Sequence, residues 1–377
     1  MARILLVHPG PDFSVADVHR GWEKALRKLG HTVMVYNSND RLTFYGHLRM
    51  ADAGQGACEH GNLPTHKALD ADGIMQLAMD GLYADLNKFW PDVVFFVSAF
   101  YMTPPMLQFI RTRRHKVVML HTESPYQDDE QMQRGQFADL NLLNDPVNLP
   151  AWKDLEVPAA YMPHAYDPDV HYPDFKRNYE FDFTFVGTLF RSRAEFFSRM
   201  DFTGIEAAFG GSGWDLAMND YPELVTAVVD KDKGYRLVDY LGHPLDYCVG
   251  NDETASLYRR ARAGINFYRR ESEEGQAGRG WAMGPREVEM AACGLFFLRD
   301  PRPESDEVFG ASERPLQGGV LPAFRSPQEA SELLRWWLDH PNLREERATQ
   351  AYARIAARTF ENNARAALGL MEESGIL

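Results

Sequence analysis

Apolar runs alternate with amphipathic stretches along the first half of the chain. The run "ARILLVH" is followed by a turn and then by residues 15–29, where apolar positions recur at helical spacing. Further apolar runs are "HTVMVYN", "DVVFFVSAF" and "KVVMLH", with a loop-rich stretch after the first and a helix predicted near Leu69–Leu86. Strands separated by helices of about 10–15 residues are typical of parallel sheets. Residues 1–165 are therefore predicted to form one doubly wound α/β domain.

The pattern restarts after the proline-rich connection "YMPHAYDPDVHYPDF". The segments "FDFTFVG", "ARAGINFY" and "LFFLRD" are predicted to be buried strands, and helical segments precede the last two. A second Rossmann-like α/β domain is therefore expected over residues 166–355. The remainder, 356–377, is expected to be a C-terminal helix that can return to the N-terminal domain. Doubly wound sheets bind ligands outside the carboxyl ends of their strands, so a cleft between the two domains is the expected site.

The composition is that of a globular protein, with 45% apolar and 25% charged residues among 377. The formal net charge of −14 argues against a broad phosphate-binding face, although not against a local basic cleft. Three cysteines without a CxxC pair make a disulfide framework or a structural zinc site unexpected and favour a cytoplasmic location. The apolar runs are shorter than the roughly 20 residues of a membrane span.

The stretch "FVGTLFRSR" carries the first candidate binding residues. Gly187 ends a predicted strand and lets a ligand approach the backbone closely. Arg191 and Arg193 follow on the next helix, where a guanidinium can bind a phosphate bidentately. The alternative interpretation is an ordinary turn followed by solvated arginines.

The stretch "GPREVE" predicts a helix that begins at a glycine loop. Its free N–H groups and positive dipole end suit a diphosphate, so Arg286 and the backbone at Gly284 are expected to serve the phosphates. A carboxylate accepts two hydroxyl hydrogen bonds, so Glu289, one turn deeper, is expected to hold a ribose diol. The alternative is an acidic first turn that only stabilises the helix dipole.

In the first domain, polar residues follow the carboxyl ends of predicted strands. His8 follows the first strand, and His121 and Glu123 lie in "LHTESPYQDDEQ". A histidine or carboxylate at such an edge can act as a general base toward a hydroxyl. The alternative for each is a solvated loop residue or a strand-end histidine bonded to the backbone. Paired aspartates elsewhere lie in loop-like surroundings, and no metal site is predicted.

Three motifs, in order, resemble one family. "REVEMAACG" is similar to the R-x-x-E-x-x-A-C-G segment of GT-B-fold glycosyltransferases, in particular the CgeB-like (spore-maturation) group. "FDFTFVGTLFRSR" and "ETASLYRRARAGINFYR" resemble that group's strand–glycine–arginine and helix–strand elements. The resemblance implies two Rossmann-like domains facing across a cleft and a nucleoside-diphosphate-sugar donor held by the second. It makes Glu289 the ribose partner, places Gly187 and Arg193 near the diphosphate, and puts Asn266 in the donor pocket.

One position departs from that pattern. Many retaining members carry a second glutamate eight residues before the first, and Trp281 occupies that place here. The usual contact to the donor sugar is therefore missing, and retention or inversion at the anomeric carbon stays open. Glu271, Glu273 and Glu274 are the nearby acids that could substitute.

The leading hypothesis is a metal-independent glycosyltransferase that needs no cofactor beyond its donor, expected to be a UDP-sugar. The acceptor would be a hydroxyl of a glycan, small molecule, protein or modified DNA base. The basic stretch "IRTRRHK" motivates an alternative, a phage-type DNA glycosyltransferase acting on a hydroxymethylated base. Trp281 motivates another, a non-catalytic nucleotide-sugar-binding protein, and a sugar-nucleotide epimerase shares the fold.

Overall fold

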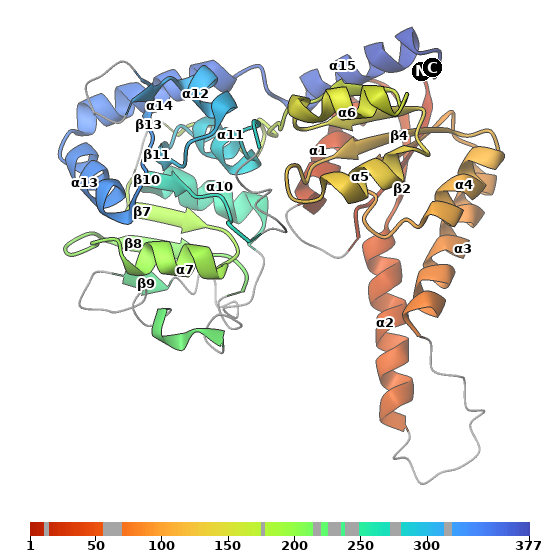
Figure 1. Ribbon diagram of the computed structural model, residues 1–377, viewed down its shortest axis with the longest axis horizontal. Coiled ribbons are helices and arrows are strands. Elements are labelled where there is room, and N and C mark those ends of the chain that lie inside the picture. Colours follow the sequence, from red (N-terminus) through yellow and green to blue (C-terminus); the bar gives the residue numbers. More distant parts are fainter. Residues whose placement is uncertain are drawn as a thin grey trace. The chain divides into compact units, whose positions relative to one another are not determined.

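The chain divides into two compact units. The computed structural model describes residues 1–10, 15–55, 70–174, 178–213, 220–224, 235–237, 249–271, 280–312 and 319–377 (Figure 1). Unit 1 comprises Met1–Asn144, Asn148–Met162 and Ala364–Leu377, and unit 2 comprises Asp145–Val147 and Pro163–Asn363. The main change of unit thus falls at 162/163, close to the boundary of 165 expected from the sequence. The last fourteen residues group with unit 1.

Unit 1 is built around a parallel sheet. Among the described residues its strands run in the order β2-β1-β3-β4-β5-β6, and every neighbouring pair is parallel. The strands are β1 (Arg3–Val7), β2 (Thr32–Tyr36), β3 (Val93–Val97), β4 (Lys116–His121), β5 (Leu140–Leu143) and β6 (Ala159–Tyr161). The helices are α1 (Val15–Lys28), α2 (Ser38–Gln55), α3 (Ala71–Phe89), α4 (Pro104–Thr112), α5 (Asp128–Gly135), α6 (Leu149–Asp154) and most of α15 (Phe360–Glu373). The 3₁₀ turn η1 (Pro146–Asn148) lies at the short segment of unit 2 that interrupts unit 1.

Both faces of this sheet are covered, as apolar runs without a polar alternation predict. Alternate residues of β1 and β3, such as Leu5 and Phe96, pack in one cluster with α3 and α4. On the other face, Trp22 of α1 lies 5.0 Å from Phe95, measured between ring centroids. One prediction was wrong: the stretch after β2, expected to be loop-rich, contains helix α2. Apolar residues in the sequence of α2 are only weakly gathered on one helical face, so the periodicity by which a helix is predicted is faint, and its Phe44 is largely exposed.

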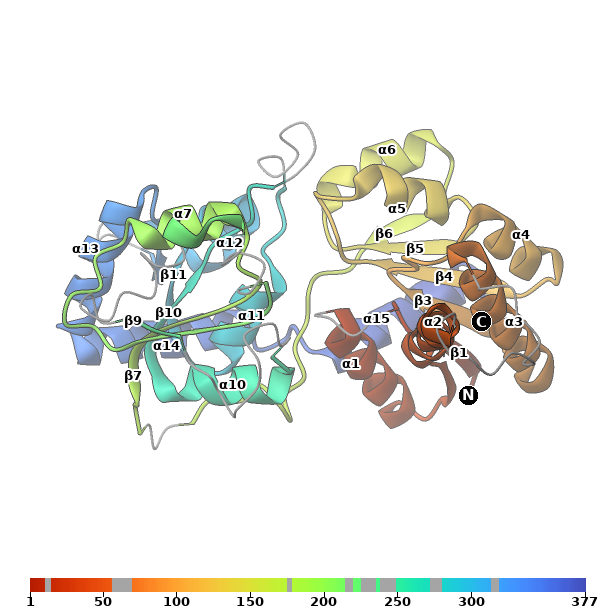
Figure 2. The ribbon, with the colours of Figure 1, turned by 90° about the horizontal axis from the view of Figure 1, so that it is seen from below.

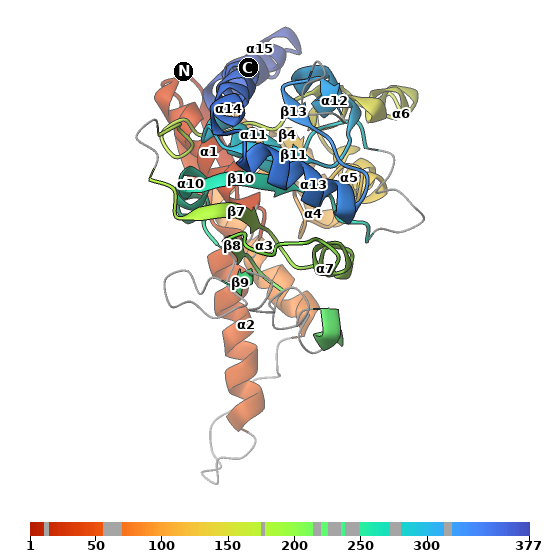
Figure 3. The ribbon, with the colours of Figure 1, turned by 90° about the vertical axis from the view of Figure 1, so that its left-hand side faces the viewer.

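Unit 2 is a second doubly wound sheet. Among the described residues its strands run β11-β10-β7-β8-β9, all parallel (Figure 3). The strands are β7 (Phe181–Val186), β8 (Ala207–Gly210), β9 (Tyr235–Leu237), β10 (Ala261–Asn266) and β11 (Phe296–Arg299), with the short pair β12 (Ala311–Ser312) and β13 (Leu321–Pro322). The helices are α7 (Arg191–Ser198), α10 (Asn251–Arg260), α11 (Pro285–Ala292), α12 (Pro303–Phe309), α13 (Pro327–Leu338) and α14 (Pro341–Ile355).

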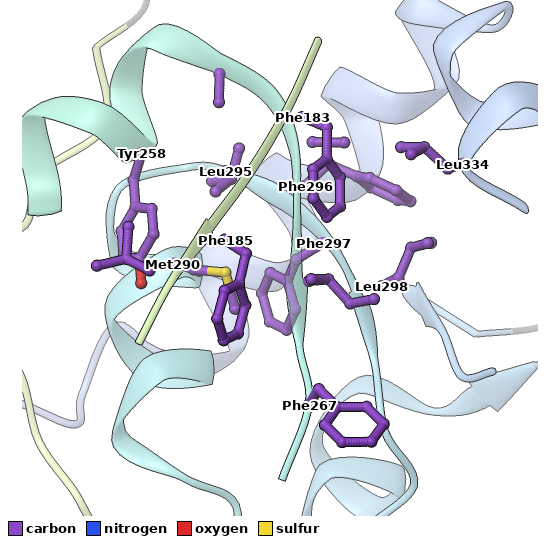
Figure 4. Packing of buried hydrophobic residues seen from close by; sticks show 14 of the residues in the cluster. Phe183, Phe185, Tyr258, Phe267, Met290, Leu295, Phe296, Phe297, Leu298 and Leu334 are labelled. Atoms are coloured by element: carbon purple, nitrogen blue, oxygen red, sulfur yellow. The ribbon is translucent and has the colours of Figure 1, made fainter. Parts of the chain in front are cut away.

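Helices cover both faces of this sheet as well. Figure 2 shows α7 on one face and α10 and α14 on the other. The core between them is strongly aromatic, and Phe183, Phe185 and Phe297 are buried within it (Figure 4). No helix among the residues that the structure describes has the length and apolarity needed to cross a bilayer.

Each sheet has one point at which the strand order reverses. In unit 1 it lies between β1 and β3, so His8 follows one of the two strands there. In unit 2 it lies between β7 and β10, whose carboxyl ends lead to Gly187 and Phe267. Loops diverge at such points and leave a crevice in which doubly wound proteins bind ligands. A ligand site is therefore expected at one of these two reversals.

At the second of these points, Gly211 is predicted to be indispensable for stability. Its φ of +126° is unfavourable for other residues, and an added Cβ would lie 2.3 Å from the carbonyl oxygen of Gly187. Gly204 also has a positive φ, +73°, but open space around it. Gly204→Ala should cost about 1–2 kcal/mol of unfolding free energy from backbone conformation alone. Gly211→Ala should cost clearly more in denaturant titrations, and equal losses would contradict this packing.

Unit 1 is predicted to lose stability as the pH falls from 6.5 toward 4. Burial lowers the pKa of His19 to about 3 and that of His121 to about 4. Below pH 6.5 the unfolded chain therefore binds protons that these folded-state side chains cannot bind. The shift of His121 corresponds to about 3 kcal/mol when fully developed. Denaturant titrations should show a shallower pH dependence for His121→Gln than for the wild type, and identical slopes would exclude a contribution from His121.

Candidate active site

Arg193 forms hydrogen bonds with both the loop after β7 and the loop after β10, the two strands between which the strand order of unit 2 reverses. From α7 its Nε and Nη2 donate to the carbonyl of Phe267, at 3.2 and 3.0 Å, and its Nη1 donates to the carbonyl of Thr188, at 2.8 Å. The guanidinium also lies 5.4 Å from the Phe185 ring centroid. Gly187 is so near that a Cβ on it would lie 3.3 Å from Nη1. Gly187 and Arg193 thus meet at the β7/β10 reversal, where Arg193 orients both loops.

The other residues at the start of α7 have protein partners. Arg191 is 66% exposed, and its Nε lies 3.0 Å from Glu195 Oε1. The Glu271 carboxylate accepts hydrogen bonds from the N–H and Oγ of Ser192, at 2.7 and 2.8 Å. Burial acts to raise the pKa of Glu271, but these hydrogen bonds hold it below its ordinary value. Glu271, one of the acids expected to replace the glutamate missing at 281, caps α7 here, and Glu273 and Glu274 lie outside the described residues.

Acidic side chains bind the backbone that leads into α11. The N–H groups of Trp281 and Ala282 donate to Asp145 Oδ2, at 2.8 and 3.1 Å. The N–H of Met283 donates to Glu304 Oε2, at 2.7 Å. Asp145 and Glu304 are both buried. The segment 281–283 is therefore fixed by carboxylates.

The next N–H, that of Gly284, is also engaged. It donates to Tyr268 Oη at 2.8 Å, and Tyr268 Oη donates in turn to Glu287 Oε1 at 2.7 Å. This geometry counts against the prediction that the backbone at Gly284 binds a phosphate, because its donor is already bonded and a carboxylate lies beyond it. That prediction relied on the general affinity of helix N-termini for anions and could not foresee an internal acid.

Glu287 is the residue that the sequence analysis missed. It is 0% exposed and also accepts hydrogen bonds from Asn266 Nδ2 at 2.6 Å and Ser305 Oγ at 2.5 Å. Burial raises the pKa of Glu287, and the hydrogen bonds oppose that shift. Asn266, predicted to lie in the donor pocket, thus has its amide on Glu287. The available signal was the pair of glutamates in the first turns of one helix, which cannot both face an anion.

Arg286 and Glu289 form an ion pair on α11. Arg286 Nη1 lies 2.9 Å from Glu289 Oε2, and the two side chains are 24% and 10% exposed. Within the described part of the chain, Glu289 Oε1 accepts no hydrogen bond. The pair lies near Tyr258 and His171, since both charges influence the pKa of each. The structure thus brings together the two side chains predicted to bind diphosphate and ribose, and it leaves one carboxylate oxygen open.

His8 occupies the order reversal of unit 1. Its Nδ1 accepts a hydrogen bond from the N–H of Gly10 at 3.3 Å, and its ring centroid lies 4.8 Å from that of His19. The backbone N–H of His8 donates to the carbonyl oxygen of Tyr36, which anchors this residue to β2. A role for His8 as a base stays a prediction that this position favours.

The other two candidate bases of unit 1 differ from His8. His121 is 1% exposed, its Nε2 lies 2.8 Å from Asn141 Oδ1, and its ring packs against Trp152. This burial counts against a contact between His121 and an acceptor. The ring is bonded to the side chain of Asn141 and not, as the alternative interpretation had it, to the backbone. Glu123 is partly buried and interacts with the charge of Arg134. Among the described residues no three His, Cys, Asp or Glu side chains are arranged to hold a metal ion.

Part of unit 2 and part of helix α15 are similar in sequence to a known family. Residues 191–369 match the model of a glycosyl transferase-like family. No curated protein sequence matches the chain significantly.

Solved structures match over the whole length. Sucrose-phosphate synthase from Thermosynechococcus elongatus is 13% identical, with 99% of each chain covered and a TM-score of 0.63. HepE from Anabaena, solved with UDP and glucose, is 10% identical, with 99% of this chain and 100% of that chain covered and a TM-score of 0.62. An alpha-glucosyltransferase solved with UDP is 11% identical, with both chains fully covered and a TM-score of 0.61. The chain therefore has the fold of the GT-B glycosyltransferases.

Proposed function

We propose that this chain transfers a glycosyl group from a nucleoside-diphosphate sugar, in particular a UDP-sugar, to a hydroxyl acceptor. The glycosyl transferase-like match of residues 191–369 supports the reaction class. The choice of UDP is supported by the similar structures solved with UDP or UDP-glucose. The Arg286–Glu289 pair is the observation that carries the proposal, because it joins a phosphate-binding and a ribose-binding group on one helix turn.

In this proposal Glu289 Oε1 accepts the ribose hydroxyls, since Oε2 is already paired with Arg286. The pairing has an electrostatic consequence. An unpaired carboxylate would repel a diphosphate, whereas the ion pair has no net charge and still presents guanidinium N–H groups. Arg193 orients the loops at the β7/β10 reversal so that the diphosphate can enter beside it.

The diphosphate leaves the sugar with a developing negative charge. Fixed positive groups stabilise such a charge without having to reorganise. In this proposal Arg193 supplies a positive group and Arg286 the positive end of its ion pair with Glu289, so the proposed reaction needs no metal ion. In unit 1, His8 is the proposed base toward the acceptor hydroxyl, because it follows a strand at the order reversal of that sheet.

UDP is predicted to stabilise the wild-type protein and to require Arg286 and Glu289. A ligand at one hundred times its dissociation constant adds about 2.7 kcal/mol to the unfolding free energy. Arg286→Ala or Glu289→Ala should weaken UDP binding by about tenfold or more, as loss of a charged hydrogen-bond partner does. Thermal-shift and calorimetric titrations measure both effects.

Arg262→Ala is the matched control, since Arg262 is also ion-paired, to Asp182, but lies at the amino end of β10. It should bind UDP as the wild type does. The proposal would be contradicted if no nucleoside diphosphate stabilised the protein, or if the Arg286→Ala and Glu289→Ala variants bound UDP with unchanged affinity. Slow hydrolysis of a bound UDP-sugar would further separate an enzyme from a non-catalytic binder.

A phage-type DNA glycosyltransferase is the second candidate. One observation favours it: an alpha-glucosyltransferase solved with UDP and a 13-mer DNA containing an HMU base shares the fold, at 12% identity and a TM-score of 0.56. The basic stretch that motivated this hypothesis is unfavourably placed. Arg111, Arg113 and Arg114 are exposed but precede β4, so they lie at the amino edge of the sheet, opposite the strand ends that doubly wound folds use for ligands.

Duplex DNA is therefore predicted not to bind. At about 50 mM salt a basic DNA-binding face gives measurable affinity that falls steeply as salt rises. Fluorescence anisotropy with a labelled duplex containing hydroxymethylated bases, with and without UDP, should show no such binding. Salt-sensitive binding that is lost when Arg111, Arg113 and Arg114 are changed to alanine would favour the DNA hypothesis instead.

A further inference from the structure

We propose that Tyr268 and Glu287 are positioning residues for nucleotide-sugar binding, which hold the first turn of α11 in register with the β7/β10 loops. The inference rests on the proposed function, because it concerns the helix that carries Arg286 and Glu289. Both residues lie within stretches by which the sequence resembles glycosyltransferases, but the resemblance assigned no role to either.

The first observation is an indirect helix cap. In a capping box, the glutamate at the third helical position accepts a hydrogen bond from the N–H of the N-cap residue. Glu287 is the third residue of α11 and Gly284 is its N-cap. Tyr268 Oη lies between them, 2.8 Å from the Gly284 nitrogen and 2.7 Å from Glu287 Oε1. The first turn of α11 is thus capped through a residue of another loop.

The second observation is how firmly Glu287 is held. Its carboxylate is fully buried and accepts from three neutral donors: Asn266 at the end of β10, Tyr268 just beyond it and Ser305 of α12. A buried carboxylate keeps one position only while its donors stay in place, since an unpaired donor or acceptor is costly. Glu287 therefore fixes α11 against β10 and α12.

The third observation connects this cap to the strand-order reversal between β7 and β10. Tyr268 directly follows Phe267, whose carbonyl accepts two hydrogen bonds from Arg193. The N–H of Tyr268 donates to Asp300, at 3.2 Å, so its backbone is anchored as well. A continuous path of hydrogen bonds and one peptide bond runs from Arg193 through Tyr268 to Gly284 and Glu287. It joins the group proposed to face the diphosphate to the helix proposed to hold the ribose.

The consequence is a geometric requirement on the donor. A nucleoside diphosphate that contacts Arg193 and Glu289 together needs a fixed spacing between them, and small displacements of binding groups weaken affinity strongly. Tyr268→Phe breaks the path with almost no change in shape. It leaves the Gly284 N–H and one acceptor site of Glu287 without their partner.

Ser305→Ala is the matched control. It removes one hydrogen bond from the same carboxylate but leaves the Gly284–Tyr268–Glu287 path intact. Calorimetric titration with UDP and thermal melting without ligand would be measured for the wild type and both variants. Both variants should melt at a lower temperature than the wild type. UDP affinity should fall by about tenfold for Tyr268→Phe, as for residues that orient ligating groups, and stay within about twofold for Ser305→Ala.

Glu287→Gln provides a second check, because glutamine keeps the oxygen that Asn266 and Tyr268 contact. It should bind UDP more tightly than Glu287→Ala.

Three results would overturn the inference. The first is that Tyr268→Phe binds UDP as tightly as the wild type. The second is that Tyr268→Phe and Ser305→Ala both lose UDP affinity in proportion to the decrease in their melting temperatures. The third is that Glu287→Gln binds UDP no more tightly than Glu287→Ala. If the wild type binds no nucleoside diphosphate, the proposed function itself fails and the inference falls with it, a result distinct from these three.

Discussion

The backbone that enters α11 depends on buried acidic side chains. Buried N–H groups must be hydrogen-bonded, and the four from Trp281 to Gly284 donate to Asp145, to Glu304 or, through Tyr268, toward Glu287. Burying carboxylates is costly unless donors surround them, and here the backbone and the neighbouring hydroxyl and amide groups supply those donors. One arrangement thus satisfies both requirements and determines where α11 begins.

This arrangement also determines what α11 can bind. Helix starts that bind phosphates present free N–H groups, whereas this one already directs Gly284 toward an internal acid. A donor diphosphate is therefore better served by guanidinium groups, Arg286 on the helix and Arg193 at the strand-order reversal. The open oxygen of Glu289 then serves the uncharged ribose. In the proposed site, different side chains thus bind the charged diphosphate and the uncharged ribose.

Much of the fold follows from the sequence, and much of the site does not. Apolar runs such as "VVFFV" and "LFFL" predict buried parallel strands because both faces of a doubly wound sheet are covered. Helix α2 escaped prediction because the apolar residues of its sequence are only weakly gathered on one face, and tertiary context determines such helices. Likewise, the sequence alone could not distinguish Glu287 from Glu289, since both lie in the first turns of one helix. Burial by Asn266 and Ser305, from distant segments, separates their roles.

The same limit applies to His121. A histidine at a strand end is equally compatible with an exposed base and with a buried hydrogen-bonded side chain, and the difference depends on Asn141 and Trp152. Where partner and motif lie on one helix, as for Arg286 and Glu289, the structure brings the two predicted side chains together, and their roles toward a donor stay predictions. Where the deciding neighbour is remote in sequence, as for His121 and Gly284, the motif alone could not show which protein groups the residue contacts.

A crystal structure of the protein with UDP tests the central claim most directly. The account predicts the ribose hydroxyls within hydrogen-bond distance of Glu289 Oε1 and the phosphates beside Arg286 and Arg193, with the Gly284–Tyr268–Glu287 path unchanged. UDP bound away from the carboxyl ends of β7 and β10, or with a phosphate on the Gly284 N–H, would contradict it.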